Sequence, residues 1–121
     1  MSYDISFKVK VEGLDNTFVR VGNCDANITW NVGTMIREAT GLSWKNEENN
    51  GLCKEVIPYI IHGLAELTQF PEKYRQYEAL NGWGTVEGCR HFFMTIITAW
   101  HDFCDDSSTS TLADVTYFWI E

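Results

Sequence analysis

The chain has few basic residues, and this shortage argues against one large class of ligands. Its 121 residues include 9 Lys and Arg against 17 Asp and Glu, which gives a formal net charge of −8. Proteins that bind free nucleic acid draw most of their affinity from Lys and Arg side chains that neutralise phosphates. We therefore expect no direct binding of nucleic acid.

Long apolar runs and low-complexity tracts are also missing. No stretch approaches the roughly 18 to 20 residues that cross a bilayer, and residues 1–4 lack the basic start of a signal peptide. We expect a cytoplasmic protein that makes no use of a membrane. Hydrophobic residues make up 45% of the chain, which excludes extensive disorder, and the length suits one core. Residues 1–121 are therefore predicted to form a single domain.

The motifs of common enzymes are absent as well. The chain contains no P-loop, no G-x-G-x-x-G, no H-E-x-x-H and no G-x-S-x-G. Its cysteines form no C-x-x-C pair and no Cys/His cluster of zinc-site spacing; they are Cys24, Cys53, Cys89 and Cys104. We expect reduced thiols, no metal, no cofactor and no enzymatic activity.

Hydrophobic periodicity predicts the elements of the fold. Apolar residues alternate over 3–12, a turn follows at 13–16, and 17–21 completes a hairpin that Gly22-Asn23 closes. Further strands are predicted over 26–30 and 112–120. Apolar residues at helical spacing predict helices over 32–41, 54–69, about 71–80 and about 86–105, with Asn31 and Thr85 as N-caps. Residues 42–52 are predicted to form a polar loop.

Together these elements predict an α+β fold. It has a small antiparallel sheet of the N-terminal hairpin, the third strand and the C-terminal strand, and three to four helices pack on one face. Residues 112–120 are apolar on both faces, so we expect this strand to return beside the N-terminal one, as a candidate for the interior of the sheet.

Three polar residues form the first candidate binding site. Asn27, Thr29 and Asn31 alternate with Ile28 and Trp30 where the third strand meets the first helix. Period 2 places the three on one face, where amide and hydroxyl groups suit an anionic or amide-rich ligand. The alternative is structural, with Asn31 capping the helix and the other two pairing across the sheet.

Two tryptophans in loops form the second candidate. Trp44 lies in the polar loop, and Trp83 lies between two glycines in Asn81-Gly82-Trp83-Gly84. Such residues are either staples onto the core or anchors of a binding surface.

Acidic residues near the end of the last helix form the third candidate. Asp102, Asp105 and Asp106 lie where the helix dipole favours cations, and residues 61–121 hold 3 basic against 9 acidic groups. Such a field steers a basic partner surface, although acidity also serves solubility alone. Asp105 and Asp106 also resemble part of a metal site when they are taken together with His101. A metal-dependent hydrolase is therefore a further hypothesis, the least favoured one.

Several short motifs resemble a known family. They are Ser2-Tyr3-Asp4-Ile5, Asn27-Ile28-Thr29-Trp30-Asn31, Pro71-Glu72-Lys73-Tyr74 and Asn81-Gly82-Trp83-Gly84. Over roughly residues 2–100 the chain resembles a widespread family of small uncharacterised phage and prophage proteins, from which residues 112–120 depart. The resemblance supplies no catalytic or ligand residue. It implies a context in which small proteins without enzyme motifs bind and block a host component, including host immune systems.

Two functional hypotheses follow. The first is a non-enzymatic inhibitor of a host anti-phage defence factor, which acts through its acidic surface on a host protein with a basic surface. The alternative is a protein that binds or sequesters a nucleotide-like metabolite through Asn27, Thr29 and Asn31.

Overall fold

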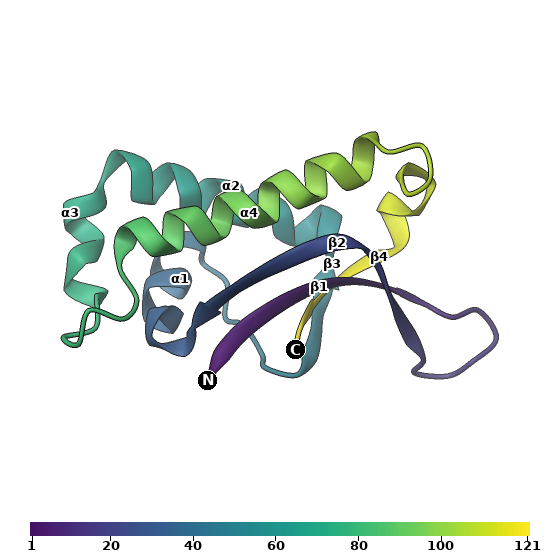
Figure 1. The fold of residues 1–121 in the computed structure, drawn as a ribbon, viewed down its shortest axis with the longest axis horizontal. Helices are drawn as coiled ribbons and strands as arrows, with labels where there is room; N and C mark the ends of the chain where they lie inside the picture. Colours follow the sequence, from purple (N-terminus) through teal and green to yellow (C-terminus); the bar gives the residue numbers. More distant parts are fainter.

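A four-stranded antiparallel sheet with strand order β2-β1-β4-β3 forms one layer of the computed structural model, which describes residues 1–121 (Figure 1). The strands are β1 (Ser2–Lys10), β2 (Phe18–Thr29), β3 (Glu48–Leu52) and β4 (Thr116–Ile120). The helices are α1 (Gly33–Thr40), α2 (Cys53–Gln69), α3 (Pro71–Tyr74) and α4 (Val86–Asp105). Short 3-10 turns cover Trp30–Val32, Arg75–Tyr77 and Ser110–Val115.

The second layer consists of helices, as the sequence predicts for an α+β fold. α2 and α4 pack against each other and against the sheet, α4 mainly on β2 (Figure 1). β4 pairs with β1 on one side and β3 on the other, so the prediction of an internal C-terminal strand beside the N-terminal one is confirmed. The strand is shorter than the predicted 112–120, because residues 112–115 lie in the 3-10 turn Ser110–Val115. No helix is long and apolar enough to cross a membrane.

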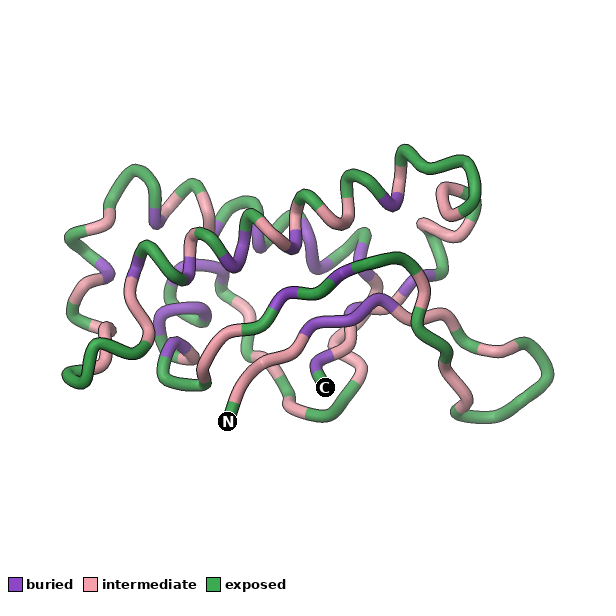
Figure 2. The backbone as a smooth tube through the Cα atoms, viewed as in Figure 1, coloured by how far each residue is buried: buried purple, intermediate pink, exposed green.

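The core lies between the two layers. It contains 22 buried hydrophobic residues, among them Phe7, Phe93 and Phe118 at 0% exposure. Cys24, Cys53 and Cys89 are buried there as free thiols, and Cys104 is half-buried. The buried positions follow β1, β4 and the inner faces of α2 and α4, whereas the hairpin tip beyond β1 is exposed (Figure 2).

The hairpin differs from the prediction at Gly22-Asn23. These residues do not end a strand, because β2 continues through them to Thr29 and includes the predicted third strand. Ile5 pairs with Ala26 whereas Phe7 pairs with Val21, so residues 22–25 face one residue of β1 and form a bulge. Gly22 has φ +70°, a conformation that glycine adopts without steric cost.

The third strand of the sheet is β3 instead, which corrects the prediction of a loop over 42–52. Its sequence, Glu-Asn-Asn-Gly-Leu, has no apolar alternation, and its partner is β4. Side-chain amides support it: Asn49 Oδ1 accepts from Gly51 N at 2.9 Å, and Asn50 Nδ2 donates to Lys45 O at 2.8 Å. Pairing with β4 therefore makes a strand of a sequence whose own preference for the strand conformation is low.

The helix boundaries follow the sequence with three corrections. Thr29, not Asn31, caps the first helical turn, because its Oγ1 accepts from Asn31 N at 3.4 Å. α2 begins at Cys53, so Pro58 lies in its second turn and the helix lacks one backbone hydrogen bond. The helix predicted over 71–80 ends early, at Tyr74, with a 3-10 turn to Tyr77. Thr85 caps α4 as predicted, accepting from Gly88 N at 3.0 Å.

The outer face of the sheet carries a small aromatic cluster of its own. Phe18 lies 5.6 Å from Tyr117 and 5.2 Å from Trp119 between ring centroids. Lys8 covers the ring of Trp119, with Nζ 4.4 Å from the ring centroid. These side chains are half-buried by one another, so the face without helices has no open apolar surface at this place.

Candidate functional site

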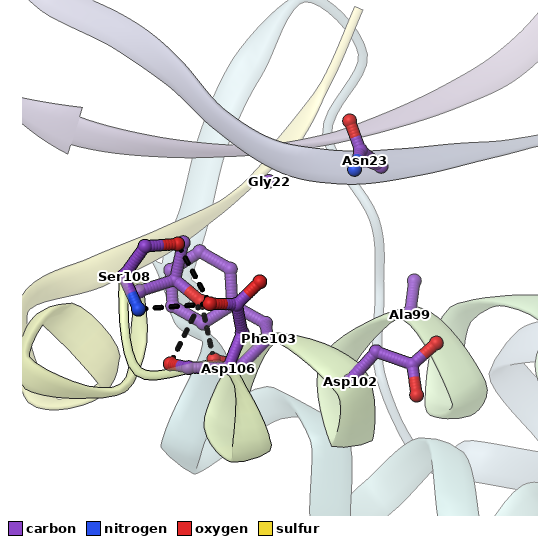
Figure 3. A pocket seen from close by; sticks show the side chains of 8 residues that line it. Gly22, Asn23, Ala99, Asp102, Phe103, Asp106 and Ser108 are labelled. Carbon is purple, nitrogen blue, oxygen red and sulfur yellow. Dashed lines mark hydrogen bonds between the residues drawn. The ribbon is translucent and has the colours of Figure 1, made fainter.

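A groove runs between the bulge of β2 and the C-terminal part of α4, from His91 onward. It consists of two cavities of about 320 and 410 Å³ that share Asn23, Ala99 and Asp102 in their walls. Figure 3 shows Gly22 and Asn23 on β2 across from Asp102 and Phe103 on α4 and from Asp106, which follows this helix. We call this the β2–α4 groove; its residues are Gly22, Asn23, His91, Met94, Thr95, Thr98, Ala99, Asp102, Phe103, Asp106, Ser108 and Thr109.

The groove is hollow because small residues line it. The residues that α4 contributes recur every three or four positions from His91 to Asp106, so they form one stripe. At the middle of this stripe lie the small side chains of Thr98 and Ala99, and Asn23 of β2 lines the same cavity. A Cβ atom on Gly22 would lie 2.7 Å from Phe103 Cδ2, so the approach of β2 to α4 requires glycine. The stripe is roughly 20 Å long.

Negative charge gathers at one end of the groove. Asp102 and Asp106 line it at the end of α4, where the helix dipole is also negative, and the last turn holds no basic residue. Asp106 Oδ1 accepts hydrogen bonds from Ser108 N at 2.8 Å and Ser108 Oγ at 2.7 Å, which lowers the pKa of the Asp106 carboxyl group. The site favours a cationic group.

Asp105 does not belong to this group. It lies outside the groove, with Oδ2 3.5 Å from His101 Nδ1 on the exposed side of α4. No group of three or more His, Cys, Asp or Glu side chains is arranged to hold a metal ion. His101, Asp105 and Asp106 therefore do not form the metal site that a hydrolase would require.

A separate cavity brings together four of the other sequence candidates. Asn27, Thr29, Asn31 and Trp83 line one open cavity of about 640 Å³, together with Trp30 and the start of β1. The structural alternative for Asn31 is wrong, since Thr29 supplies the cap. We call this cavity the Trp83 pocket.

Trp44 lines neither the β2–α4 groove nor the Trp83 pocket, although it lines a smaller cavity of about 260 Å³ beside the pocket. Its ring lies 5.5 Å from Tyr3, 5.9 Å from Phe92 and 5.5 Å from Phe118, measured between ring centroids. These contacts make Trp44 a staple that holds the loop before β3 onto the core.

The buried thiols offer no nucleophile. Burial raises the pKa of Cys24 to about 11 and that of Cys89 to about 12, and it also raises those of Cys53 and Cys104. A protonated thiol is a poor nucleophile at neutral pH. The cysteines therefore act as small core residues.

Sequence reasoning missed the groove wall formed by Gly22 and Asn23. The available signal was a Gly-Asn pair inside an otherwise continuous strand pattern, which is typical of a bulge as well as of a strand end. No family model, curated protein or solved structure matches this chain.

Proposed function

We propose that the protein is a non-enzymatic inhibitor of phage or prophage type, which blocks a host defence factor by binding a basic segment of it. The observation that carries the proposal is the β2–α4 groove with Asp102 and Asp106 at one end. The phage setting rests on the family resemblance of the short motifs between Ser2 and Gly84. The absence of familiar enzyme motifs favours binding over catalysis.

The shape of the groove suits an extended segment. Its roughly 20 Å length accommodates about six residues of strand, at about 3.3 Å per residue. β2 is the outer strand of the sheet, so its outward backbone groups have no strand partner. Partners that add to a sheet edge gain main-chain hydrogen bonds there and specificity from neighbouring side chains.

The charge of the groove suits a basic segment. Lys or Arg side chains of the partner would reach the carboxylates of Asp102 and Asp106 without competition from a basic residue in the last turn of α4. The net charge of −8 adds long-range attraction, which acts mainly on the association rate.

A matched pair of double variants tests the proposal. The wild-type protein is used to capture partners from bacterial lysate at low salt, and association with the isolated partner is then measured at several salt concentrations. We expect Asp102→Asn/Asp106→Asn to slow association about tenfold and to flatten its salt dependence. The control, Asp105→Asn/Asp114→Asn, changes the net charge equally but outside the groove, and should keep most of the rate.

Two results would contradict the proposal. Capture of no partner at low salt would remove the inhibitor function. Equal loss of rate in both double variants would show that net charge, and not the groove, attracts the partner.

A further inference from the structure

The Trp83 pocket carries a second inference, independent of the groove. Trp30 and Asn31 lie in the wall of the pocket and also in the wall of an adjoining cavity of about 260 Å³. Arg37 lines that adjoining cavity. Between them the two cavities are lined by the indole of Trp83, the side-chain amides of Asn27 and Asn31 and the guanidinium group of Arg37. The larger cavity, of about 640 Å³, is within the size range of small-ligand sites.

Trp83 is exposed but held in place. Its side chain is 68% exposed and makes no ring pair with another aromatic residue. Its backbone N donates to Asn81 Oδ1 at 3.0 Å, and Gly84 after it has φ +97°. A Cβ atom on Gly84 would lie 2.8 Å from Val32 Cγ1 and 3.4 Å from Asn31 Cβ, so the loop is pressed against the pocket wall. An unstacked indole on a loop that packs against the pocket wall offers a surface for a planar ring.

The amides beside this indole are free. The side-chain hydrogen bonds in the pocket wall run from Trp30 Nε1 to Ser2 O at 2.8 Å and from Asn31 N to Thr29 Oγ1 at 3.4 Å. Neither uses the side-chain amide of Asn27 or Asn31. Each of these amides offers donors and an acceptor together, the combination that pairs with the mixed edge of a nucleobase.

Arg37 supplies a positive charge in the adjoining cavity, which Asn31 also lines. Its side chain is exposed on α1 and makes no ion pair, unlike Arg75, which contacts Glu72, Glu78 and Glu87. Arg37 is the one Lys or Arg residue that lines either of these two cavities. Guanidinium groups bind phosphate through paired N–H donors.

We propose that this pocket binds a mononucleotide, with its base stacked on Trp83, the edge of the base hydrogen-bonded by Asn27 and Asn31, and its phosphate at Arg37. A longer strand is disfavoured because its further phosphates would meet a surface of net charge −8. The ligand class is therefore a single planar base that carries an anionic group.

Calorimetric titration with defined probes tests this inference. AMP, GMP, CMP and UMP are titrated first, followed by adenosine and inorganic phosphate alone. We expect at least one mononucleotide to bind, its nucleoside to bind more weakly, and phosphate alone not to bind. Trp83→Leu should weaken nucleotide binding roughly tenfold through the lost stacking. Arg37→Gln should lower the affinity for the nucleotide towards that for the nucleoside, and it should leave the affinity for the nucleoside unchanged.

The same loop provides a matched control. Leu80 is fully exposed and lines neither cavity, so Leu80→Ala should bind the nucleotide as the wild type does. Absence of binding by all four mononucleotides, or unchanged binding by Trp83→Leu, would overturn the inference. A short single-stranded oligonucleotide that bound more than tenfold tighter than its mononucleotide would show a strand site instead. Because the pocket and the groove share no residue, failure at one leaves the other standing.

Discussion

At the scale of single residues, three aspartates that look equivalent in the sequence have different surroundings. Asp102 and Asp106 line the groove, whereas Asp105 faces His101 on the exposed side of α4. Only Asp106 is held by hydrogen bonds from Ser108, which offset its unfavourable position at the negative end of the helix. Helical spacing alone places all three near one another, but the chain after residue 106 decides which of them gains a partner.

Glu121 gives a prediction about acid stability. Its Oε1 accepts from Lys8 Nζ at 2.7 Å and from Ser6 Oγ at 2.9 Å, and the bond from Lys8 is the main cause of its lowered pKa. A carboxyl group with a lowered pKa in the folded state stabilises the protein above its ordinary pKa, and this contribution is lost as the pH falls through the folded value. Glu121→Gln should therefore cost about 0.2–1 kcal/mol of unfolding free energy at pH 7.

Urea unfolding from pH 7 to pH 3 measures this effect. The difference between the wild type and Glu121→Gln should shrink towards zero at the acid end. Glu12→Gln, which removes an exposed carboxylate without an ion pair, is the control and should show no such convergence. A difference that stays constant with pH would assign the role of Glu121 to packing.

At the scale of elements, strong hydrophobic periodicity is sufficient to predict a helix or strand from the sequence, and weak periodicity is not. The alternation of residues 3–12 and the apolar stripes of residues 54–69 and 86–105 predicted β1, α2 and α4 to within a few residues. β3 could not be found, because its polar sequence forms a strand only when β4 lies beside it. The Gly-Asn pair at residues 22–23 fits a strand end as well as a bulge, and only the pairing of β2 with β1 distinguishes the two.

The internal position of β4 gives the second prediction. Phe118 is fully buried and its ring lies 5.5 Å from Trp44, whereas Trp119 lies on the outer face under Lys8. Phe118→Ala should lower the free energy of unfolding by about 3–5 kcal/mol, and Trp119→Ala by about 1 kcal/mol. A fragment of residues 1–110, which lacks β4 altogether, should not fold.

Denaturant titrations of the two variants, and circular dichroism of the fragment, measure these effects. Equal losses from Phe118→Ala and Trp119→Ala would contradict the assignment of one side chain to the core and the other to the outer face. A cooperatively melting 1–110 fragment would show that β4 is dispensable to the fold.

At the scale of the whole molecule, the fold class followed from the sequence but the two sites did not. Asn27 and Trp83 are 56 positions apart in the sequence, and only the packing of the 81–84 loop on the end of β2 brings them together. The groove likewise needs the bulge of β2 and the small residues of α4 at once. The acidic character of the chain is evident from its composition. Which carboxylates line the groove, those of Asp102 and Asp106, is evident only from the tertiary structure.

Net charge gives the last prediction. Three of the basic residues, Lys8, Lys54 and Arg75, are engaged with carboxylates, and most acidic groups have no cationic partner. Exposed ion pairs each contribute little, while repulsion acts over the whole surface of a chain with net charge −8. Raising NaCl from 0.02 to 0.3 M, values chosen to shorten the Debye length from roughly 20 to 6 Å, should therefore raise the Tm of the wild type.

The aspartates near the end of α4 provide the internal test of this argument. Asp102→Asn/Asp105→Asn leaves Asp106 and its bonds to Ser108 intact, and it removes two carboxylates that the helix dipole disfavours. We expect its Tm at low salt to exceed that of the wild type by about 2–6 °C, and its rise with NaCl to be smaller. Calorimetric scans of both proteins at each salt concentration measure the two effects. A Tm that fell with NaCl in the wild type would mean that the ion pairs around Arg75 outweigh the excess of negative charge, and an unchanged Tm in the variant would mean that solvent already screens these carboxylates.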